Sequence, residues 1–513
     1  MLVKTFGSAV YGIKATTVTV EVSVVPGVNF FLVGLPDSAV KESQHRITCA
    51  LRTHGHKWPG RQVVINMAPA DIRKEGSAYD LPLAMGILAA SEQIANIEKL
   101  NEYLIMGELS LDGSLQPIKG ALPIAIQARE EGFKGFILPK HNASEAAVVD
   151  NLDVYGVENI KEVIDFFNGG EELQSTTIDT RQEFLTCANT YDVDFSEVKG
   201  QENVKRALEI AAAGGHNVIM VGAPGSGKTM LAKRLPTIIP PLTLSEALET
   251  TKIHSVAGRV DQYKGLMTKR PFRAPHHTIS DVALVGGGAY PQPGEISLSH
   301  NGVLFLDELP EFKRAVLEVM RQPLEDRHIT ISRAKFSIDY PANFMLVASM
   351  NPCPCGYHNH PEKECVCLPG MVQKYLNRIS GPLLDRIDIH IEVVPVAFDK
   401  LSDLAPAETS AQIRERVIRA RTIQQRRLHD ESGMHSNAML TSRLIKEYCQ
   451  LDTAGAAMLR NAMERLGLSA RAYDRILKVS RTIADLEGEE NILPHHLAEA
   501  IQYRTLDREG WAG

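Results

Sequence analysis

The sequence predicts an α/β protein with a central phosphate-binding core, a helical lid after it and an α+β domain before it. Three observations lead to this prediction. A glycine-rich loop stands between an apolar strand-like run and a helical run at 217–235. Strand-like and helical stretches alternate from 194 to about 395, which is typical of a parallel sheet with crossover helices. From about 405 onward the periodicity is helical.

The length and composition place the chain among globular proteins. Its 513 residues correspond to about three domains, and 44% hydrophobic with 23% charged residues excludes a disordered or fibrous chain. The net charge of -7 excludes a general attraction to nucleic acid, so DNA binding would need a local basic patch. No apolar run reaches the roughly 18 residues of a membrane helix, and no signal peptide pattern is visible. The odd number of cysteines, 7, fits a reducing compartment.

Changes in periodicity divide the chain into four segments. The N-terminal α+β domain is expected at 1–165, where β-branched runs mix with helix-like runs. Residues 166–193 lack sustained periodicity, which indicates a linker. The phosphate-binding core is expected at 194–395 and the helical lid at 396–513.

The strongest motif follows the apolar run 217–221. It has the pattern G-x-x-x-x-G-K-T and leads into a helix, which is the context that a P-loop requires. Its glycines let backbone N–H groups surround a phosphate, and the helix N-terminus favours negative charge there. Lys228 would reach the β and γ phosphates and Thr229 would bind Mg²⁺, so ATP and Mg²⁺ are the expected cofactors. The predicted nucleotide-binding residues are Gly222, Ala223, Pro224, Gly225, Ser226, Gly227, Lys228, Thr229 and Asp307.

Two further strand-like runs end in polar side chains. VLFLDE (303–308) places Asp307 and Glu308 at the carboxyl end of a buried strand, where open α/β sheets bind ligands. There Asp307 would hold the Mg²⁺ together with Thr229, and Glu308 would polarise the attacking water; an exposed strand end is the alternative. FMLVASMN (344–351) ends in Asn351, which would orient that water or simply form an Asn-Pro turn.

Two arginines are candidates for completing the site. Arg386, in GPLLDRIDIH, would reach a neighbouring subunit's nucleotide, or else pair with Asp385 or Asp388 of its own chain. Such transferred arginines contribute about 10³–10⁵ in rate. Arg471 would reach the nucleotide from the lid, although Arg475 lies on the same helix face and competes for that role.

Taken together, these motifs resemble an AAA+ ATPase. Segments 270–288, 293–312 and 321–344 look like its magnesium-chelatase-like branch. With VGLPDSAVKES (33–43) and NMAPADIRKEGSAYDLPLA (66–84), essentially the whole chain resembles the YifB/ComM competence family. The resemblance implies a bacterial cytoplasmic protein that forms a ring, expected to be a homo-hexamer. It further implies a helicase that promotes branch migration during recombination of imported DNA.

Two insertions in the core are candidates for contact with DNA. HITIS (328–332) and FSIDY (336–340) alternate with period two, which predicts a β-hairpin whose tip carries Arg333 and Lys335. The resemblance places such a hairpin near the pore of a ring, where a basic collar would bind phosphates; a solvated basic tip is the alternative. The second insertion, within 228–303, holds His276 and His277, which could equally be structural. No matched carboxylate is expected near them, so catalysis is not expected there.

Two further sets of arginines and one set of four cysteines are also candidates for a role. Arg270 and Arg273 stand before Gly286–Gly288 in a Pro-rich context that suits a second pore-facing loop. The basic helix with Arg414, Arg416, Arg419 and Arg421 is expected to be the solvated face of the lid. CPCGYHNHPEKECVC supplies Cys353, Cys355, Cys365 and Cys367, which together would close a tetrahedral Zn²⁺ site. His358 and His360 are rival ligands, and reduced free cysteines are the alternative.

The N-terminal domain resembles the S5-like fold of the Lon protease's proteolytic domain. Lon-type enzymes use a Ser–Lys dyad, and Ser77 stands at the matching serine. The matching basic position holds Ile124, with Lys119 in the preceding turn. A scaffold or DNA-contact role is therefore expected in place of peptidase activity.

The preferred function from sequence is therefore an ATP-driven DNA motor. A magnesium-chelatase-like metal-insertion subunit is the first alternative, disfavoured by the extra N-terminal domain and the cysteine cluster. A Lon-like ATP-dependent protease is the second, disfavoured by Ile124. A nucleotide-gated assembly factor without helicase action is the third.

Overall fold

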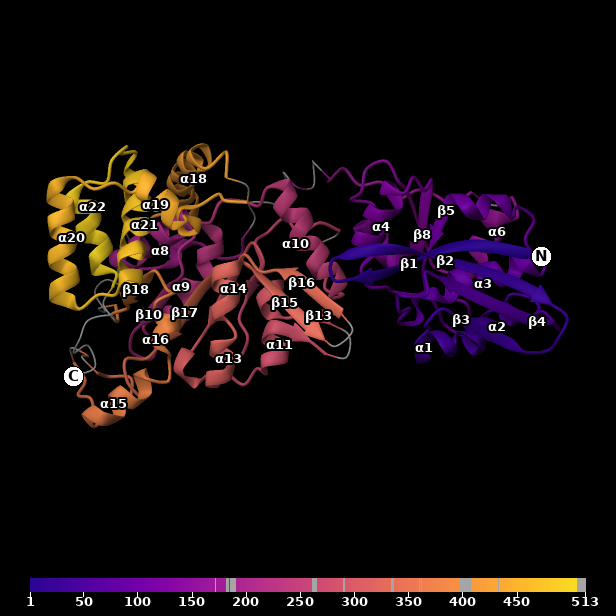
Figure 1. The fold of residues 1–513 in the computed structure, drawn as a ribbon, viewed down its shortest axis with the longest axis horizontal. Coiled ribbons are helices and arrows are strands. Elements are labelled where there is room, and N and C mark those ends of the chain that lie inside the picture. Colours follow the sequence, from indigo (N-terminus) through magenta and orange to yellow (C-terminus); the bar gives the residue numbers. More distant parts are fainter. Residues whose placement is uncertain are drawn as a thin grey trace. The chain divides into compact units, whose positions relative to one another are not determined.

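A computed structural model of the chain describes most of its 513 residues and divides them into two compact units. Unit 1 comprises 1–187 and 243–268, and unit 2 comprises 188–242 and 269–513. Each unit is described by itself (Figure 1). The described residues are 1–170, 172–180, 184, 191–260, 265–288, 291–333, 336–358, 360, 362–396, 407–431 and 433–504.

Unit 1 is built on a seven-stranded mixed sheet with strand order β3-β4-β2-β1-β5-β8-β9. Its centre is antiparallel, because β1 pairs with β2 and β2 with β4, while the other pairs are parallel. Valine alternates with more polar residues along the middle of β2, and its Val18, Val20 and Val22 are fully buried. The strands are β1 (Leu2–Tyr11), β2 (Lys14–Val25), β3 (Phe30–Val33), β4 (Gln62–Ala68), β5 (Tyr103–Ile105), β8 (Gly135–Pro139) and β9 (Asp153–Val157), with a small β6 (Glu108–Leu109) and β7 (Leu115–Gln116) pair.

Helix α3 is buried along its whole length, which its nearly uninterrupted apolar sequence requires. The helices of unit 1 are α1 (Ser38–Lys41), α2 (Ser43–Thr53), η1 (Ser77–Tyr79), α3 (Asp80–Ala90), η2 (Glu98–Glu102), α4 (Ala121–Glu130), α5 (Lys140–Ala146), α6 (Ile160–Phe167) and α10 (Leu244–Val256).

Helix α10 belongs to a different unit from the one that the expected domain boundaries assign to it. It lies in the middle of the predicted core, yet it packs in unit 1, where the backbone N–H of Gly120 donates to Ser255 O at 3.1 Å. The N-terminus of α10 is fixed by a capping box between Thr243 and Glu246. Likewise, the expected boundary at 165 falls inside α6. Periodicity predicts a helix, but it carries no information about which unit the helix packs against.

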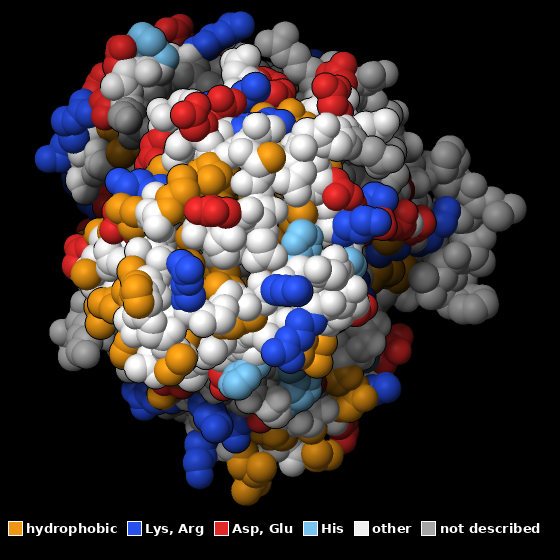
Figure 2. All heavy atoms as spheres, turned by 90° about the vertical axis from the view of Figure 1, so that its right-hand side faces the viewer, with side chains coloured by type: hydrophobic (Ala, Val, Ile, Leu, Met, Phe, Trp, Pro, Cys, Tyr) orange, Lys and Arg blue, Asp and Glu red, His pale blue; other side chains and the backbone are white. Residues whose placement is uncertain are grey.

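Hydrophobic side chains reach the surface of unit 1 at its edge strand. Phe31, Val33 and Leu35, on and just after β3, are about half exposed. Figure 2 shows such hydrophobic side chains lying among basic and acidic ones on one face of the molecule.

Unit 2 contains a five-stranded sheet with strand order β11-β14-β17-β10-β18, and all of its pairs are parallel. The carboxyl ends of β10, β14 and β17 therefore meet at one edge. The sheet strands are β10 (Val218–Val221), β11 (Phe272–Arg273), β14 (Val303–Leu306), β17 (Met345–Met350) and β18 (Ile389–Glu392).

Two small antiparallel pairs accompany this sheet. They are β12 (Gly286–Gly287) with β13 (Gln292–Pro293), and β15 (His328–Arg333) with β16 (Phe336–Pro341). The helices around the sheet are η3 (Phe195–Glu197), α8 (Glu202–Gly214), α9 (Lys228–Arg234), η4 (Leu235–Thr237), α11 (Asp281–Val285), α12 (Glu295–Leu298), η6 (Leu309–Glu311), α13 (Arg314–Glu318), α14 (Arg321–Asp326), α15 (Pro369–Leu376) and α16 (Gly381–Leu384).

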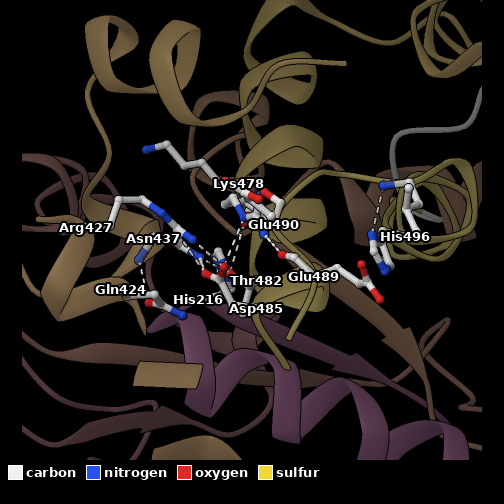
Figure 3. A network of polar contacts seen from close by, with 12 residues as sticks. His216, Gln424, Arg427, Asn437, Lys478, Thr482, Asp485, Glu489, Glu490 and His496 are labelled. Carbon is white, nitrogen blue, oxygen red and sulfur yellow. Dashed lines mark hydrogen bonds and ion pairs between the residues drawn. The ribbon is translucent and has the colours of Figure 1, made fainter. Parts of the chain in front are cut away.

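The lid is helical, as predicted. Its elements are α18 (Ser410–Arg427), η7 (Asn437–Met439), α19 (Ser442–Tyr448), α20 (Thr453–Leu466), α21 (Ala470–Glu487) and α22 (Pro494–Gln502). Buried Asp485 of α21 accepts hydrogen bonds from Arg427, Arg481 and Asn437. Figure 3 shows Arg427 and Asn437 converging on Asp485. Thr482 of the same helix lies 2.8 Å from His216 Nε2, which follows α8 of the core. Buried polar contacts thus join the lid to the core.

The α/β fold class with a parallel-sheet core and helical lid is confirmed. Within the described part of the chain, none of the helices combines the length and the apolar character that crossing a membrane requires.

Candidate nucleotide-binding site

The phosphate loop joins β10 to α9, and its backbone requires glycine at three positions. Gly225 and Gly227 have positive φ angles of 78° and 92°. At Gly222 a Cβ atom would lie 2.3 Å from Val393 O. Around Gly225, by contrast, the described residues leave a Cβ position without neighbours within 4 Å, so the loop is open at this point. A phosphate group fits such an open loop at a helix N-terminus.

Lys228 begins α9, and its side chain is buried under this loop. Its Nζ donates to Gly222 O at 2.7 Å and Ala223 O at 2.9 Å, and lies 3.3 Å from Asn351 Oδ1. Burial lowers the pKa of Lys228, while the nearby carboxylates of Asp307 and Glu308 oppose that shift. All its acceptors are oxygens, which are the atoms that a triphosphate would also offer.

Asp307, at the end of β14, joins the phosphate loop to β17. Thr229 Oγ1 donates to Asp307 Oδ2 at 2.8 Å, and the hydroxyl of Ser349 donates to Asp307 Oδ1. A hydroxyl and a carboxylate at one point form the oxygen donor set that Mg²⁺ prefers beside a triphosphate, so Thr229 and Asp307 fit as its protein ligands. Ser349 was not predicted, because the apolar run in which it lies hides a single hydroxyl.

Glu308 stands next to Asp307 in the left-handed region, with φ 53°. Its side chain is half exposed, and its Oε2 lies 3.6 Å from His277 Nδ1. The ring of His277 also contacts His276, with centroids 4.1 Å apart. The expectation that these histidines lack a nearby carboxylate is therefore wrong for His277. The two residues belong to different strand ends, and only the sheet order β11-β14 brings them together.

The core arginine has a partner in its own chain that the sequence analysis did not consider. Arg386 is 7% exposed, and it pairs with Glu325 at 2.6 Å and donates to Pro382 O at 2.6 Å. Asp385 and Asp388, the partners considered from sequence, pair with lid arginines instead. A cavity of about 450 Å³ beside Arg386 is lined by Glu325, Val319 and other residues of α13 to β15.

The two candidate arginines of the lid, Arg471 and Arg475, have different partners. Arg475 pairs at 3.1 Å with Asp388, which is buried and also accepts the backbone N–H of Asn217. Burial alone would raise the pKa of Asp388, but Arg475 and His216 hold it well below its usual range. Arg475 is thus an anchor between lid and core. Arg471 pairs with Asp385 at 3.1 Å, and 60% of its side chain is exposed, so it remains the candidate for nucleotide contact.

The four cysteines of the predicted zinc site lie together after β17. All four sulfur atoms are within 4.8 Å of one another, and those of Cys353, Cys355 and Cys365 are separated by 3.3–3.7 Å. The rival ligand His360 accepts the backbone N–H groups of Glu362 and Lys363 at its Nδ1. The geometry thus favours four thiolates as the ligand set.

The predicted hairpin is confirmed as β15 and β16, in the register Arg333↔Phe336. The side chain of Arg333, and Lys335 as a whole, lie outside the described residues, so their role in DNA binding stays a prediction. The two arginines of the second insertion bind residues within the same insertion. Arg273 pairs with Glu295 at 2.6 Å, and Arg270 donates to the backbone carbonyls of Pro240 and Asn301.

Most of the basic face of α18 is only partly exposed and is paired with neighbouring residues, contrary to expectation. Arg414 donates to Thr237 O, Arg416 pairs with Glu209 and Glu408, and Arg421 donates to the carbonyls at the end of α8. Arg419 is exposed. This face therefore attaches the lid to the core.

In unit 1 the predicted dyad position lacks a base. The Ser77 hydroxyl donates to Glu108, not to an amine. Ile124 is buried in α4, and the stem of Lys119 lies over Gly258. Lys74, three residues before the serine, is buried and donates to Pro69 O. A hydroxyl bound to a carboxylate, with no lysine among its described partners, does not form a Ser–Lys nucleophile.

Comparisons with known protein families cover all three parts of the chain. Residues 194–401 match the family model "Magnesium chelatase, subunit ChlI". Residues 407–504 match "Magnesium chelatase, subunit ChlI C-terminal". Residues 20–142 match "Subunit ChlI of Mg-chelatase". The N-terminal segment, which was expected to distinguish this chain from chelatase subunits, thus also matches a model with a chelatase description.

Relatives of similar length match from end to end. Competence protein ComM of Haemophilus influenzae is 45% identical over 505 residues, 98% of this chain and 97% of that protein. Protein YifB of Escherichia coli, which is uncharacterized, is 42% identical over 502 residues, 98% and 96% of the two chains. A partial match also exists: Lon protease 2 of Bacillus subtilis is 31% identical over 129 residues, which are 25% of this chain and 23% of that protein.

Proposed function

This chain belongs to the magnesium-chelatase-like AAA+ family that includes ComM and YifB, and we propose that it is an ATP-driven motor acting on DNA. One observation carries the ATPase part of the proposal. Lys228, Thr229, Asp307 and Asn351, from three separate stretches of the sequence, meet at the carboxyl edge of one parallel sheet.

Each residue has a distinct task in hydrolysis. Lys228 and the loop N–H groups would bind the phosphates, and Thr229 and Asp307 would hold Mg²⁺, which neutralises phosphate charge when bound. Glu308 would accept a proton from the attacking water, and Asn351, beside Lys228, would orient that water. The loop geometry supports phosphate binding, because the described residues leave the space beside Gly225 open.

A second copy of the chain would complete the site. Arg386 would stabilise the charge that develops on a neighbour's nucleotide, a contribution of about 10³–10⁵ in rate. To do so it must leave Glu325, which holds it in the isolated chain. Arg471 would close from the lid of the subunit that binds the nucleotide. This arrangement calls for a closed ring, and we propose a homo-hexamer.

DNA is the proposed substrate of the motor. The name of the relative ComM, a competence protein, supports a role in natural transformation. The hairpin β15–β16 offers a place for contact, with Arg333 and Lys335 at its tip as the proposed DNA-binding residues. We propose that the ring binds single-stranded or branched DNA in the cytoplasm and promotes branch migration during recombination of imported strands.

The test is a branch-migration assay on a forked DNA substrate with the full-length chain. ATP-dependent strand exchange is expected, and it should be absent in Lys228→Ala and Glu308→Gln. The double variant Arg333→Ala with Lys335→Ala should lower the DNA affinity and flatten its salt dependence. Strand exchange without ATP, or none on any DNA structure, would refute the motor. An unchanged salt slope would remove the hairpin from the proposal.

A metal-insertion ATPase is the second candidate, because the family models that match all three parts are those of a magnesium chelatase subunit. DNA discriminates the two: a motor that acts on DNA should hydrolyse ATP faster when single-stranded or branched DNA is added, whereas a chelatase-type subunit should not respond.

We also propose that Cys353, Cys355, Cys365 and Cys367 hold a structural Zn²⁺.

A further inference from the structure

The segment that follows β17 and carries the four cysteines, residues 351–368, lies directly against the phosphate loop and is called the cysteine segment below. Gly356, with φ 86°, approaches Pro224 so closely that a Cβ atom at Gly356 would lie 2.5 Å from Pro224 Cδ. Just before this segment, Met350 O accepts the backbone N–H of Gly222 at 3.2 Å, and at its start Asn351 Oδ1 lies 3.3 Å from Lys228 Nζ. One short stretch of chain thus contacts the beginning, the middle and the lysine of the loop.

Little apolar packing holds this segment in place. Cys353 is fully buried, but Val366 and Leu368, beside Cys367, are 83% and 69% exposed. A segment with so few buried side chains needs another source of order. The separations of 3.3–3.7 Å between the sulfur atoms of Cys353, Cys355 and Cys365 are close to the roughly 3.8 Å that tetrahedral zinc with 2.3 Å bonds would impose.

We propose that a zinc ion bound by the four thiolates fixes the cysteine segment against the phosphate loop and thereby sets the affinity for nucleotide. On binding, four S–Zn bonds form and the thiol protons pass to solvent. The ion then holds Gly356 on Pro224 and Asn351 beside Lys228 without touching the nucleotide. This inference rests on the proposed nucleotide function, which it extends to the control of that site.

A second cluster of possible metal ligands, in the lid, shows that a metal site needs side chains with free lone pairs. Glu487, His495 and His496 also lie within 4.8 Å of one another. However, His496 Nδ1 accepts the backbone N–H of Leu493, so its Nε2 carries the proton and donates it to Glu487 at 3.0 Å. An imidazole in that tautomer presents no lone pair to a metal from Nε2. The four cysteines have no such conflict, because each thiol can lose its proton.

The first experiment measures zinc and nucleotide binding in the full-length chain. Elemental analysis should find one zinc per chain, and the double variant Cys355→Ser with Cys365→Ser should lose it. The matched control is Cys449→Ser, a buried cysteine of the lid outside the cluster, which should keep the zinc. Titration with a fluorescent ATP analogue should show affinity about tenfold weaker in the double variant. Absence of zinc from the wild-type chain, or unchanged affinity in the zinc-free variant, would overturn the proposal.

The second experiment separates the contact from the metal. Gly356→Ala should keep the zinc but weaken nucleotide binding, because its Cβ would displace Pro224. Gly433→Ala is the control for backbone strain alone: its φ is 76°, and the described residues leave its Cβ position free within 4 Å. Equal affinities in the two variants would refute the contact. If the wild-type chain binds zinc but no nucleotide, the proposed function fails while the zinc result stands as a separate finding.

Discussion

Two buried lysines, Lys228 in unit 2 and Lys74 in unit 1, have similar environments on a first inspection. Lys228 is 8% exposed and Lys74 is fully buried. Burial lowers the pKa of both, and both donate to backbone carbonyl groups. Each also stands close in sequence to a hydroxyl that a motif would make functional.

The surroundings distinguish them. Next to Lys228, the hydroxyl of Thr229 on α9 meets the carboxylate of Asp307 at the end of β14, beside a loop that is open at Gly225. Near Lys74, the hydroxyl of Ser77 is held by Glu108, and the lysine is directed to Pro69 O. A lowered lysine pKa therefore does not identify a functional site. What identifies it is the convergence of complementary groups on a space that a ligand can enter.

The largest expected effect tests this difference directly. Lys228→Ala should reduce the steady-state rate of ATP hydrolysis at least about 100-fold, because it removes a charge that the transferring phosphate needs. Lys74→Ala should leave that rate within a factor of two, since the residue belongs to unit 1. Phosphate release by the full-length variants measures both. A comparable loss in a folded Lys74→Ala protein would contradict the distinction.

A smaller effect is expected at His277, which lies beside Glu308 and not beside Lys228. His277→Ala should lower the rate of ATP hydrolysis about tenfold through misplacement of Glu308, while the affinity for nucleotide stays unchanged. His276→Ala is the neighbouring control, because His276 contacts Thr278 and the ring of His277 but no carboxylate in the described contacts. Weaker nucleotide binding in His277→Ala would assign it to the phosphate loop instead.

The sequence was sufficient for the features that depend on local pattern. The phosphate loop, the strand ends at Asp307 and Asn351 and the hairpin 328–341 are recognisable because their residues are close together in the chain. Features that depend on sheet order were missed. His277 meets Glu308 only because β11 and β14 are neighbours, and Arg386 meets Glu325 across the fold. The packing of α10 in unit 1 was missed for the same reason.

A third buried lysine extends the comparison to stability. Burial, reinforced by Arg475, lowers the pKa of Lys478 in the lid from 10.5 to about 8. Between these pH values the unfolded chain binds more protons than the folded chain, so the free energy of unfolding should rise with pH. The contribution is about 2 kcal/mol between pH 7.5 and 9.5. Chemical denaturation of the wild type and of Lys478→Met at both pH values should show this rise only in the wild type.

The smallest effect is expected on the Lys74 side of the comparison, at Ser77. Its hydroxyl is a donor to Glu108, so Ser77→Ala should cost about 1 kcal/mol of stability in unit 1. Neither the wild type nor the variant should digest casein, with or without ATP, because a hydroxyl held by a carboxylate lacks the base that would deprotonate it. Casein digestion by the wild type that disappears in Ser77→Ala would show that unit 1 carries a nucleophile after all. In that case Lys74 would be the nearest buried amine in sequence able to activate it, and the distinction between the two lysines would no longer hold.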